Sequence, residues 1–318
     1  MKIIGTGRSL PKNIVTNDDL AKVMDTSDEW IVTRTGISER RLVKEETTTS
    51  MSANAALQAL RQSNMSVQDI DLIIVATISA DANMPSTACQ VQDIIGAVNA
   101  VAFDLAAACS GFLFALNTAY AYLKSGLYKN ALVIGAETLS KIVNWEDRST
   151  CVLFGDGAGA VIATAAEEGM YNMLQYTDGS KGNVLTYKNP PVHNILVQNK
   201  LVLEYIAMEG QEVFKFAVTK VPESIQALLE KEYVSTEDIK YFVLHQANKR
   251  IIQSVAKRLH VSEEKFPINM NKYGNTSAAS IPILLDEMNE QGMLHKGDKI
   301  ILSGFGGGLS WGVSLLQW

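Results

Sequence analysis

The sequence predicts an α/β protein built from two similar units, and three observations support this fold class. Short apolar, β-branched runs alternate along the chain with segments whose apolar residues have helical spacing. The pattern repeats, because Asp71–Ala76 and Ile239–Leu244 each begin a series of strand, small-residue turn and helix. Finally, 47% of the 318 residues are apolar and 19% are charged, which suits a sizeable buried core. Alternation of this kind is typical of parallel sheets covered by helices on both faces.

The predicted elements fall on either side of a polar middle segment, residues 169–203, which we expect to form loops and short strands. Before it we expect strands at 72–76, 100–105, 131–135, 151–154 and 160–163, and helices at 49–63, 85–95 and 111–124. After it we expect helices at 212–231, 249–260 and 277–291, and strands at 240–244, 299–303 and 311–318. The boundary therefore lies near residue 170, and it divides the chain into 1–170 and 171–318.

Composition excludes several classes of protein. Three cysteines, at 89, 109 and 151, are too few and too irregular for a disulfide framework, and with four histidines they show no metal-ligand spacing. The net charge of −6 argues against nucleic-acid binding. No apolar run is long enough to cross a membrane, and Met1–Gly5 lacks the layout of a signal peptide. We therefore expect a cytoplasmic protein with reduced thiols, no metal, and no nucleic-acid or membrane partner.

Cys109 is the first candidate for chemistry. It lies in the small-residue turn Ala106–Phe112, between a predicted strand and the helix 111–124. The free N–H groups and positive dipole at a helix N-terminus favour a thiolate, which is the nucleophilic form. A free cysteine is also among the residues most often buried for packing alone. Local context therefore leaves Cys109 either a nucleophile or an inert core residue.

Three glycine-rich segments are candidates for ligand-binding loops. Gly5-Thr6-Gly7 is rejected as a dinucleotide loop because Leu10 and Pro11 follow where a glycine and a helix are needed. Gly155–Ala160 has the wrong spacing and predicts a tight turn or bulge with positive φ. Gly304–Gly308 ends a strand. It is either a hairpin turn or a place where bare backbone N–H groups approach a ligand and stabilise an oxyanion.

His245, Asn275 and Gly307 each lie just past a predicted strand or at a helix start, as Cys109 does. The carboxyl ends of parallel strands are where ligands bind in open sheets. Alone, His245 would more often be structural and Asn275 a helix cap. Their joint placement with Cys109 favours one shared site.

Seven motifs in order make the chain similar to the β-ketoacyl-acyl-carrier-protein synthase III family of the thiolase superfamily. The similarity covers nearly the whole chain. The motifs are Asp25-Thr-Ser-Asp-Glu-Trp-Ile, Arg34-Thr-Gly-Ile, Ala107-Ala-Cys-Ser-Gly, Phe154-Gly-Asp-Gly-Ala-Gly, His245-Gln-Ala-Asn, Gly274-Asn-Thr-Ser-Ala-Ala-Ser and Phe305-Gly-Gly-Gly. The resemblance implies the thiolase-like duplicated five-layer α/β/α/β/α fold, usually a homodimer, with 1–170 and 171–318 as its halves.

The resemblance also implies a reaction and its residues. Cys109 takes an acyl group from acetyl-CoA or another short acyl-CoA, and condensation with malonyl-acyl carrier protein then begins fatty-acid synthesis. His245 and Asn275 donate hydrogen bonds to the enolate formed on loss of CO₂. The amides of Cys109 and Gly307 stabilise the tetrahedral oxyanion, and Phe305 shields the thiol from water. No cofactor is implied, since acyl-CoA is a substrate.

The CoA entrance is assigned in the same way. Trp30 and Arg148 would hold the adenine between them by stacking and cation–π attraction. Arg34 would meet phosphates, Asn248 the pantetheine arm, and Thr26 belongs to the same group. For each of these residues the alternative is an ordinary surface role.

The resemblance assigns the carrier protein to a basic surface. Lys249, Arg250, Lys257 and Arg258 lie on one predicted helix, and Lys215 joins them by resemblance. Runs of this kind are usually just solvated faces. An acidic carrier protein would be steered by such a surface.

Met84 is a departure from several family members, which have Phe before the proline and place it in the partner subunit's acyl pocket. Methionine is flexible and tolerates different shapes. The primer is therefore acetyl by default, with longer or branched acyl groups left open.

Two alternatives belong to other classes. A papain-like cysteine peptidase fits the order Cys109, His245, Asn275 and the separation of 136 residues (245 − 109), but the expected sequence around the cysteine is absent. A non-catalytic binding module on the same fold is the other. Within the superfamily, condensation without decarboxylation would need a second cysteine near Gly304, where there is none.

Overall fold

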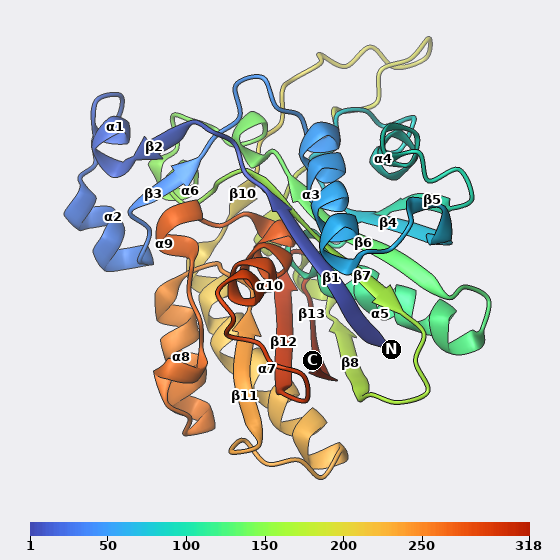
Figure 1. Cartoon of the computed structure of the whole chain (residues 1–318). Helices are drawn as coiled ribbons and strands as arrows, with labels where there is room; N and C mark the ends of the chain where they lie inside the picture. The colour runs from blue at the N-terminus through green and yellow to red at the C-terminus, as the bar shows by residue number, and fades with distance from the viewer.

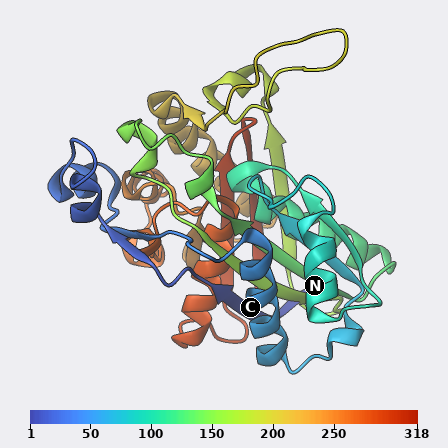
Figure 2. The same cartoon turned by 90° about the horizontal axis from the view of Figure 1, so that it is seen from above.

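Two β-sheets alternate with three layers of helices in the computed structural model, which describes residues 1–318 (Figures 1 and 2). Helices α3 and α4 cover the outer face of the first sheet, α5 and α10 lie between the sheets, and α7 and α8 cover the second. This is the predicted five-layer arrangement. The layer helices are α3 (Thr48–Ser63), α4 (Thr87–Ile95), α5 (Gly111–Ser125), α7 (Gly210–Lys231), α8 (Lys249–Leu259) and α10 (Ser280–Glu290).

Both sheets are mixed, whereas the alternation of strands and helices predicts parallel sheets. The first has the order β1-β7-β6-β4-β5, in which only the β4–β5 and β4–β6 pairs are parallel. The second has the order β11-β12-β13-β8, in which only β11–β12 is parallel. The prediction was wrong because apolar periodicity identifies a strand but carries no information about its direction. The strands are β1 (Lys2–Ser9), β4 (Leu72–Ala76), β5 (Val101–Leu105), β6 (Asn130–Glu137), β7 (Gly157–Thr164), β8 (Tyr171–Thr177), β11 (Ile239–Leu244), β12 (Lys299–Gly306) and β13 (Ser310–Gln317).

The central layer joins the two sheets through one apolar core. Its buried side chains include Leu72 and Ile74 of β4, Phe112 of α5, and Ile300 and Leu302 of β12. The strands of the first sheet end at residue 164 and those of the second begin at residue 171. The division into 1–170 and 171–318 stays a prediction, since the halves share this core.

Two predictions for the segment after α5 were wrong. Residues 151–154 are not a strand, because α6 (Arg148–Cys151) and a turn occupy this stretch. Gly155–Ala160 is not a turn with positive φ, because Gly157 begins β7. Glycine is needed there for close approach: a Cβ on Gly155 would lie 2.1 Å from the Tyr273 carbonyl oxygen, and one on Gly159 would lie 2.5 Å from the Ile283 nitrogen.

The Gly5-Thr6-Gly7 segment lies inside β1 and packs on α3, which agrees with its rejection as a nucleotide loop. A Cβ on Gly7 would lie 2.2 Å from the Ala55 carbonyl oxygen. The two glycines therefore let a strand and a helix approach at backbone distance.

Smaller elements surround the layers. They are β2 (Ile14–Thr16), α1 (Asn17–Ala21), α2 (Asp28–Thr35), β3 (Glu39–Arg41), β9 (Leu185–Thr186), β10 (Ala207–Met208), α9 (Met270–Tyr273), and the short 3₁₀ turns η1 (Val67–Asp69), η2 (Ala108–Ser110), η3 (Leu139–Lys141), η4 (Gly179–Val184), η5 (Glu263–Lys265) and η6 (Ser277–Ala279). Between β9 and β10 a long loop stands away from the body in both views (Figures 1 and 2). None of the helices is at once long and apolar enough to span a bilayer.

Candidate active site

Cys109 lies in η2, between β5 and the start of α5, as the sequence predicts. The turn is tight, since Ala108 has φ +46°, and the cysteine is 9% exposed. Ser110, the N-cap residue of α5, makes no side-chain cap bond; its hydroxyl lies 2.7 Å from both the Ala107 carbonyl oxygen and Ser310 Oγ. No side-chain acceptor therefore caps the start of α5 beside the thiol.

The protonation state of Cys109 differs from the expectation that the helix N-terminus favours a thiolate. Burial raises the pKa of the Cys109 thiol to about 12, while the Ser277 hydroxyl acts to lower it and the Glu137 carboxyl acts to raise it. Loss of hydration disfavours the charged form of a buried group. Cys109 is therefore a neutral thiol at neutral pH, and its proton must leave before the sulfur can attack.

His245 follows β11 and is fixed by two contacts. Its Nδ1 lies 2.7 Å from Ser280 Oγ, and its ring meets Phe305 edge-on with centroids 5.1 Å apart. Burial lowers the pKa of His245 to about 3, so the imidazole is neutral. Ser280 Oγ also accepts a hydrogen bond from the Gln246 amide at 3.3 Å. With the Ser280 hydroxyl donating to Nδ1, the ring proton is assigned to Nε2, which makes Nε2 a donor.

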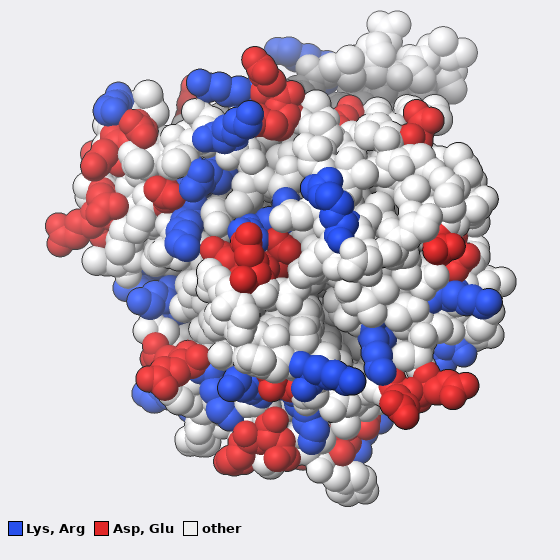
Figure 3. All heavy atoms as spheres, viewed as in Figure 1, with Lys and Arg blue, Asp and Glu red and all other residues white.

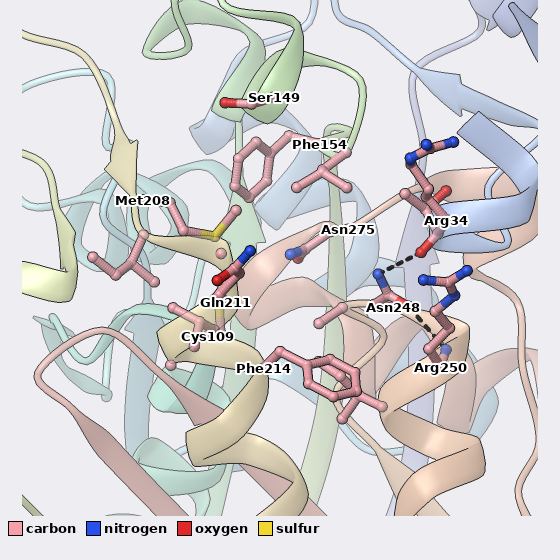
Figure 4. A pocket seen from close by; sticks show the side chains of 18 of the residues that line it. Arg34, Cys109, Ser149, Phe154, Met208, Gln211, Phe214, Asn248, Arg250 and Asn275 are labelled. Atoms are coloured by element: carbon pink, nitrogen blue, oxygen red, sulfur yellow. Dashed lines mark hydrogen bonds between the residues drawn. The ribbon is translucent and has the colours of Figure 1, made fainter. Parts of the chain in front are cut away.

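Asn275 is held by its neighbours with its amide group free. Its Oδ1 accepts a hydrogen bond from the Ser277 amide at 2.8 Å. The backbone of Asn275 bonds to Leu153 (2.8 Å) and to Gly155 (3.0 Å), the segment whose glycines allow this approach. Because Oδ1 is occupied, the Nδ2 group is the one left to donate, and the side chain points into the pocket (Figure 4).

One cavity of about 630 Å³ brings Cys109, His245, Asn275 and Phe305 together. It runs from a basic mouth to the thiol: Figure 4 shows Arg34, Asn248 and Arg250 on one side and Cys109 near Met208 and Gln211 on the other. The three candidate reactive residues, which are 136 and 30 residues apart along the chain (245 − 109 and 275 − 245), thus meet in one chamber. The full lining is Trp30, Arg34, Thr35, Cys109, Ser149, Val152, Leu153, Phe154, Leu185, Met208, Gly210, Gln211, Val213, Phe214, Lys215, His245, Ala247, Asn248, Arg250, Ile251, Asn275, Phe305 and Gly306.

A second cavity, of about 180 Å³, also borders Cys109 and is largely apolar. Gly307 lines it together with Ser277. The backbone of β12 comes closest to the thiol one residue earlier, where a Cβ on Gly306 would lie 2.8 Å from Cys109 Cβ. The other residues that line this second cavity are Ile78, Ala108, Leu139, Phe154, Leu185, Thr186, Tyr187 and Ile206.

Trp30, which lines the mouth of the cavity, has two arginine side chains over its ring. The Arg34 guanidinium lies 4.6 Å from its ring centroid and that of Arg148 lies 5.1 Å away. A ring stacked between Trp30 and Arg148 would need about 7 Å, that is, two contacts of about 3.5 Å, so Arg148 must move to admit an adenine. Arg148 is held by the Asp25 carbonyl and, at 3.1 Å, by the Asp25 carboxylate, an exposed pair that costs little to break. Thr26, next to Asp25, has a buried Oγ1 without a partner and does not line the cavity.

Asn248 has a local role as well as a place on the cavity wall. It is the N-cap of α8, where its Oδ1 accepts from the Arg250 amide at 2.8 Å. Its Nδ2 donates to the Arg34 carbonyl oxygen at 3.0 Å, which ties α8 to α2 (Figure 4). A contact to pantetheine would have to share or replace these bonds.

The predicted basic surface is present on α8. Lys249, Arg250, Lys257 and Arg258 are exposed and none of them forms an ion pair, whereas Lys215 pairs with Glu212 at 2.6 Å. Over the face seen in Figure 3 as a whole, basic and acidic side chains are interspersed.

Met84 is 87% exposed and lines neither cavity of its own chain. No group of three or more His, Cys, Asp or Glu side chains is arranged to hold a metal ion.

Sequence reasoning missed Glu137, Ser280, Phe154 and Gly306 as parts of the site, and Ser277 as a neighbour of the thiol. Ser277 and Ser280 lie within a motif that was recognised, but the sequence did not say which way their side chains point. Glu137 carried no signal beyond being an acidic residue at the end of an apolar strand.

Comparisons with known proteins identify the family of the chain. Residues 103–182 match the family model 3-Oxoacyl-[acyl-carrier-protein (ACP)] synthase III, and residues 229–318 match the model of its C-terminal part. The chain is 56% identical to the Beta-ketoacyl-[acyl-carrier-protein] synthase III of Clostridium novyi, covering 100% of this chain and 99% of that protein. It is 51% identical to the protein of the same name from Clostridium acetobutylicum, covering 100% and 98%. The crystal structure of 3-oxoacyl-[acyl-carrier-protein] synthase III from Aquifex aeolicus superposes with a TM-score of 0.94, at 50% identity and with 100% and 99% of the two chains covered.

The fold and these similarities define a condensing enzyme, an acyltransferase with the thiolase fold. The chain belongs to the 3-oxoacyl-[acyl-carrier-protein] synthase III family, also called the β-ketoacyl synthase III family. The resemblance read from the seven motifs is confirmed, and the peptidase alternative is excluded.

Proposed function

We propose that this chain condenses a short acyl-CoA with malonyl-acyl carrier protein, giving a 3-oxoacyl-acyl carrier protein, CoA and CO₂, the step that begins fatty-acid synthesis. The observation that carries the proposal is the meeting of Cys109, His245 and Asn275 in one cavity with a basic mouth. The related proteins reported above are named as 3-oxoacyl- or beta-ketoacyl-[acyl-carrier-protein] synthases.

In the first stage the Cys109 sulfur attacks the acyl-CoA thioester. A bond forms between the sulfur and the acyl carbon, the bond to the CoA sulfur breaks, and CoA leaves. A covalent intermediate divides one difficult condensation into two easier steps. The amides of Cys109 and Gly307 are assigned to the oxyanion, which fixed donors stabilise without reorganisation.

In the second stage malonyl-acyl carrier protein loses CO₂ and the resulting carbanion attacks the acyl-Cys109 carbonyl. Negative charge develops on the malonyl thioester oxygen as the carboxylate leaves. The Nε2–H of His245 and the Nδ2–H of Asn275 are assigned as donors to this oxygen. Each such donor in a dry site contributes about 3 kcal/mol. The lowered pKa of His245 suits this role, because the neutral ring keeps its one N–H proton and has little tendency to accept a second. All steps use this chain's own groups, so the proposal calls for no cofactor.

The primer is assigned to the small apolar cavity behind Cys109. Its volume of about 180 Å³ and apolar lining suit a short acyl chain and disfavour a charged one. Acetyl is the first candidate, and short branched groups are the alternative.

The mouth of the large cavity is assigned to CoA and to the acyl carrier protein. Trp30, Arg34, Arg148, Asn248 and Thr26 would bind CoA. The exposed basic residues Lys249, Arg250 and Lys257, with Lys215, would receive an acidic carrier protein. Because the mechanism requires a reduced thiol, we place the activity in the cytoplasm.

We also propose that the working unit is a homodimer formed through β5. This strand lies at the edge of the first sheet with β4 as its one neighbour, and Val101 on it is 50% exposed. Ile94, Val98 and Met84 continue the exposed apolar surface beside it. An uncovered apolar edge strand is a site of association, and a second copy would cover it. This arrangement is consistent with a Met84 that contributes to the partner's pocket rather than to its own.

The test is intact-protein mass spectrometry after mixing with acetyl-CoA and then with malonyl-acyl carrier protein. We expect the mass to rise by one acetyl group on Cys109 and to return when the second substrate is added with release of CO₂. Cys109→Ala is the matched control and should not gain the acetyl group. Isobutyryl-CoA in parallel measures the primer preference. If no short acyl-CoA acylates the wild-type protein, the proposed function is wrong.

A further inference from the structure

A buried carboxyl group lies beside the nucleophile and has no role in the two stages above. Glu137 ends β6 and is fully buried. Hydrogen bonds to its Oε2 come from the hydroxyl of Ser79 (2.5 Å), the hydroxyl of Thr77 (3.2 Å) and the amide of Ile78 (3.2 Å). Its other oxygen, Oε1, is buried and has no hydrogen-bond partner. Buried polar atoms of this kind are rare in folded proteins, so Oε1 needs an explanation.

Ser277 lies between this carboxyl and the thiol. The turn η6 is wedged between η2 and β6: a Cβ on Gly135 of β6 would lie 2.2 Å from the Ala278 carbonyl oxygen. Ser277 is 2% exposed and lines the same small cavity as Cys109. Its Oγ has no hydrogen-bond partner, and its hydroxyl acts to lower the pKa of both the Cys109 thiol and the Glu137 carboxyl. Two buried oxygens without a hydrogen-bond partner, Ser277 Oγ and Glu137 Oε1, therefore lie on the side of η6 that connects the thiol to β6.

The charge environment leaves Glu137 ready to accept a proton near neutral pH. Burial raises the pKa of Glu137 to about 7, against the hydrogen bonds that lower it. The groups acting on it from the segment after β4 and from η6 are neutral hydroxyls and an amide, and the titratable group that it acts on is the Cys109 thiol. Beyond them, Asp81 and Lys141 pair with each other at 3.5 Å.

We propose that Glu137 is a positioning residue that takes the Cys109 proton through Ser277 and holds it for the lifetime of the acyl enzyme. The inference rests on the proposed function and adds the fate of the thiol proton to it. As acylation begins, the S–H proton passes to Ser277 Oγ while the Ser277 hydroxyl proton passes to Glu137 Oε1. The products are a thiolate, an unchanged serine and a neutral carboxylic acid.

The proton count closes over a full cycle. The thiolate forms its bond to the acyl carbon, and CoA leaves as a thiolate that takes a proton from water. In the second stage the carbanion displaces the Cys109 sulfur, and the proton held on Glu137 returns through Ser277 to restore the thiol. One proton from solution is consumed for each CoA released, and no oxidant or further reactant is needed.

Neutralising Glu137 changes the rate of acylation in opposite directions, depending on whether Glu137 accepts the Cys109 proton or acts only through its negative charge. A negative charge beside the sulfur disfavours the thiolate, so removing that charge without a relay makes acylation faster. If the carboxylate accepts the proton, its loss makes acylation slower, by roughly 100-fold at neutral pH, the lower range for a general base.

The experiment measures the single-turnover rate of acetylation by acetyl-CoA from acid to alkaline pH, for wild type, Glu137→Gln and the exposed control Glu230→Gln. We expect the wild-type and control rates to rise with pH through about 7, as Glu137 loses its proton. Glu137→Gln should be slow and should lack this rise. A Glu137→Gln rate equal to or above that of wild type would overturn the inference.

Ser277→Ala tests the relay without removing the charge. It deletes the hydroxyl but keeps the backbone amide that holds Asn275. We expect a loss similar to that of Glu137→Gln, and no further loss in the double variant, because both changes break one path. Full activity of Ser277→Ala, or losses that simply add, would overturn the relay.

A measurement on the wild type guards against variants that fold poorly. Infrared difference spectra, recorded one pH unit above the pKa of Glu137, should show the C=O band of a protonated carboxylic acid appearing on acetylation. No such band in the acetylated wild type would overturn the inference alone. A wild type that no acyl-CoA acylates would instead overturn the proposed function and this inference with it.

Discussion

At the scale of single residues, one short segment sets the state of the three candidate reactive groups. The Ser277 amide holds Asn275 by its carbonyl oxygen, and the Ser280 hydroxyl lies 2.7 Å from His245 Nδ1. The Ser277 hydroxyl acts on the Cys109 thiol. Because six consecutive residues, 275–280, provide all of these contacts, small shifts of this segment would affect both stages of the reaction together.

Ser280→Ala should impair condensation and spare acylation. Without the Ser280 hydroxyl, nothing assigns the proton of His245 to Nε2, and we expect decarboxylation of malonyl-acyl carrier protein to fall by roughly 10- to 100-fold. Acetylation of Cys109 should change little. The two rates are measured separately by mass spectrometry and by CO₂ release. Ser254→Ala, which removes a hydroxyl bonded within the exposed part of α8, is the control. Equal loss in both stages would contradict the assigned role.

At the scale of elements, the site depends on backbones that touch. β12 passes directly behind the nucleophile at Gly306, and β7 and the segment before it pass behind α9 and α10 at Gly155 and Gly159. In these places a side chain of any size would push apart elements that flank the reactive groups. Glycine is therefore required by distance rather than by φ.

Gly306→Ala should reduce acylation by roughly 100-fold, the cost of displacing a reacting atom by about 1 Å. The new Cβ would lie 2.8 Å from Cys109 Cβ and 3.3 Å from its sulfur. Gly179→Ala is the matched control, since a Cβ there meets no atom within 4 Å. Acetylation kinetics check the prediction. A wild-type rate in Gly306→Ala would contradict it and would show that β12 can shift to accommodate the new methyl group.

α8 illustrates how one helix serves two surfaces. Ile251, Ile252 and Val255 are buried, while Lys249 and Arg250 are exposed, and Arg250 lines the mouth of the cavity. Such an amphipathic helix presents its charges where they act on an approaching partner rather than on the fold.

Arg250→Glu should weaken use of malonyl-acyl carrier protein several-fold more than use of acetyl-CoA, because a rim charge acts mainly on the association of a charged partner. The difference should shrink at high salt. Lys231→Glu is the control and makes the same charge change. Lys231 ends α7, a helix of 22 residues that begins at the cavity with Gly210, so it lies about 30 Å along the helix from the cavity and its change should have little effect. Steady-state kinetics, with acetyl-CoA and malonyl-acyl carrier protein varied in turn, measure the loss for each substrate. Equal losses for both substrates would count against docking at α8.

At the scale of the whole molecule, the site forms where the two sheets and the central layer meet. Cys109 comes from the first sheet's side, and His245 and Asn275 come from the second. The central core contains side chains from both, so neither half presents a complete site by itself. A buried titratable group at such a junction affects stability as well as chemistry.

Glu137→Gln should stabilise the protein at pH 8 and have a smaller effect at pH 5. The folded-state pKa of Glu137 is raised to about 7 from 4.5, so the folded state holds a proton that the unfolded state has released between these values. Stability therefore falls as pH rises from 4.5 through 7, by about 3 kcal/mol in all for this one group. Denaturant unfolding at both pH values measures it, with Glu230→Gln as the control. An equal effect of Glu137→Gln at both pH values would contradict the raised pKa.

Local sequence patterns were sufficient to predict the elements with strong signals and to propose the reactive residues. β4 spans Leu72–Ala76 as predicted, and the motifs around Cys109, His245 and Asn275 led to the family that the comparisons confirm. These features depend on neighbouring residues in the chain, so a local pattern is enough to reveal them.

Three features could be known only from the folded arrangement: the direction of the strands, the helical turn at Arg148–Cys151 and the neutral state of the thiol. The folded arrangement also brought Glu137 and Ser277, which are 140 residues apart (277 − 137), to the nucleophile. The physical reason is that desolvation and hydrogen bonding depend on what surrounds a group in space, and those neighbours come from distant parts of the chain.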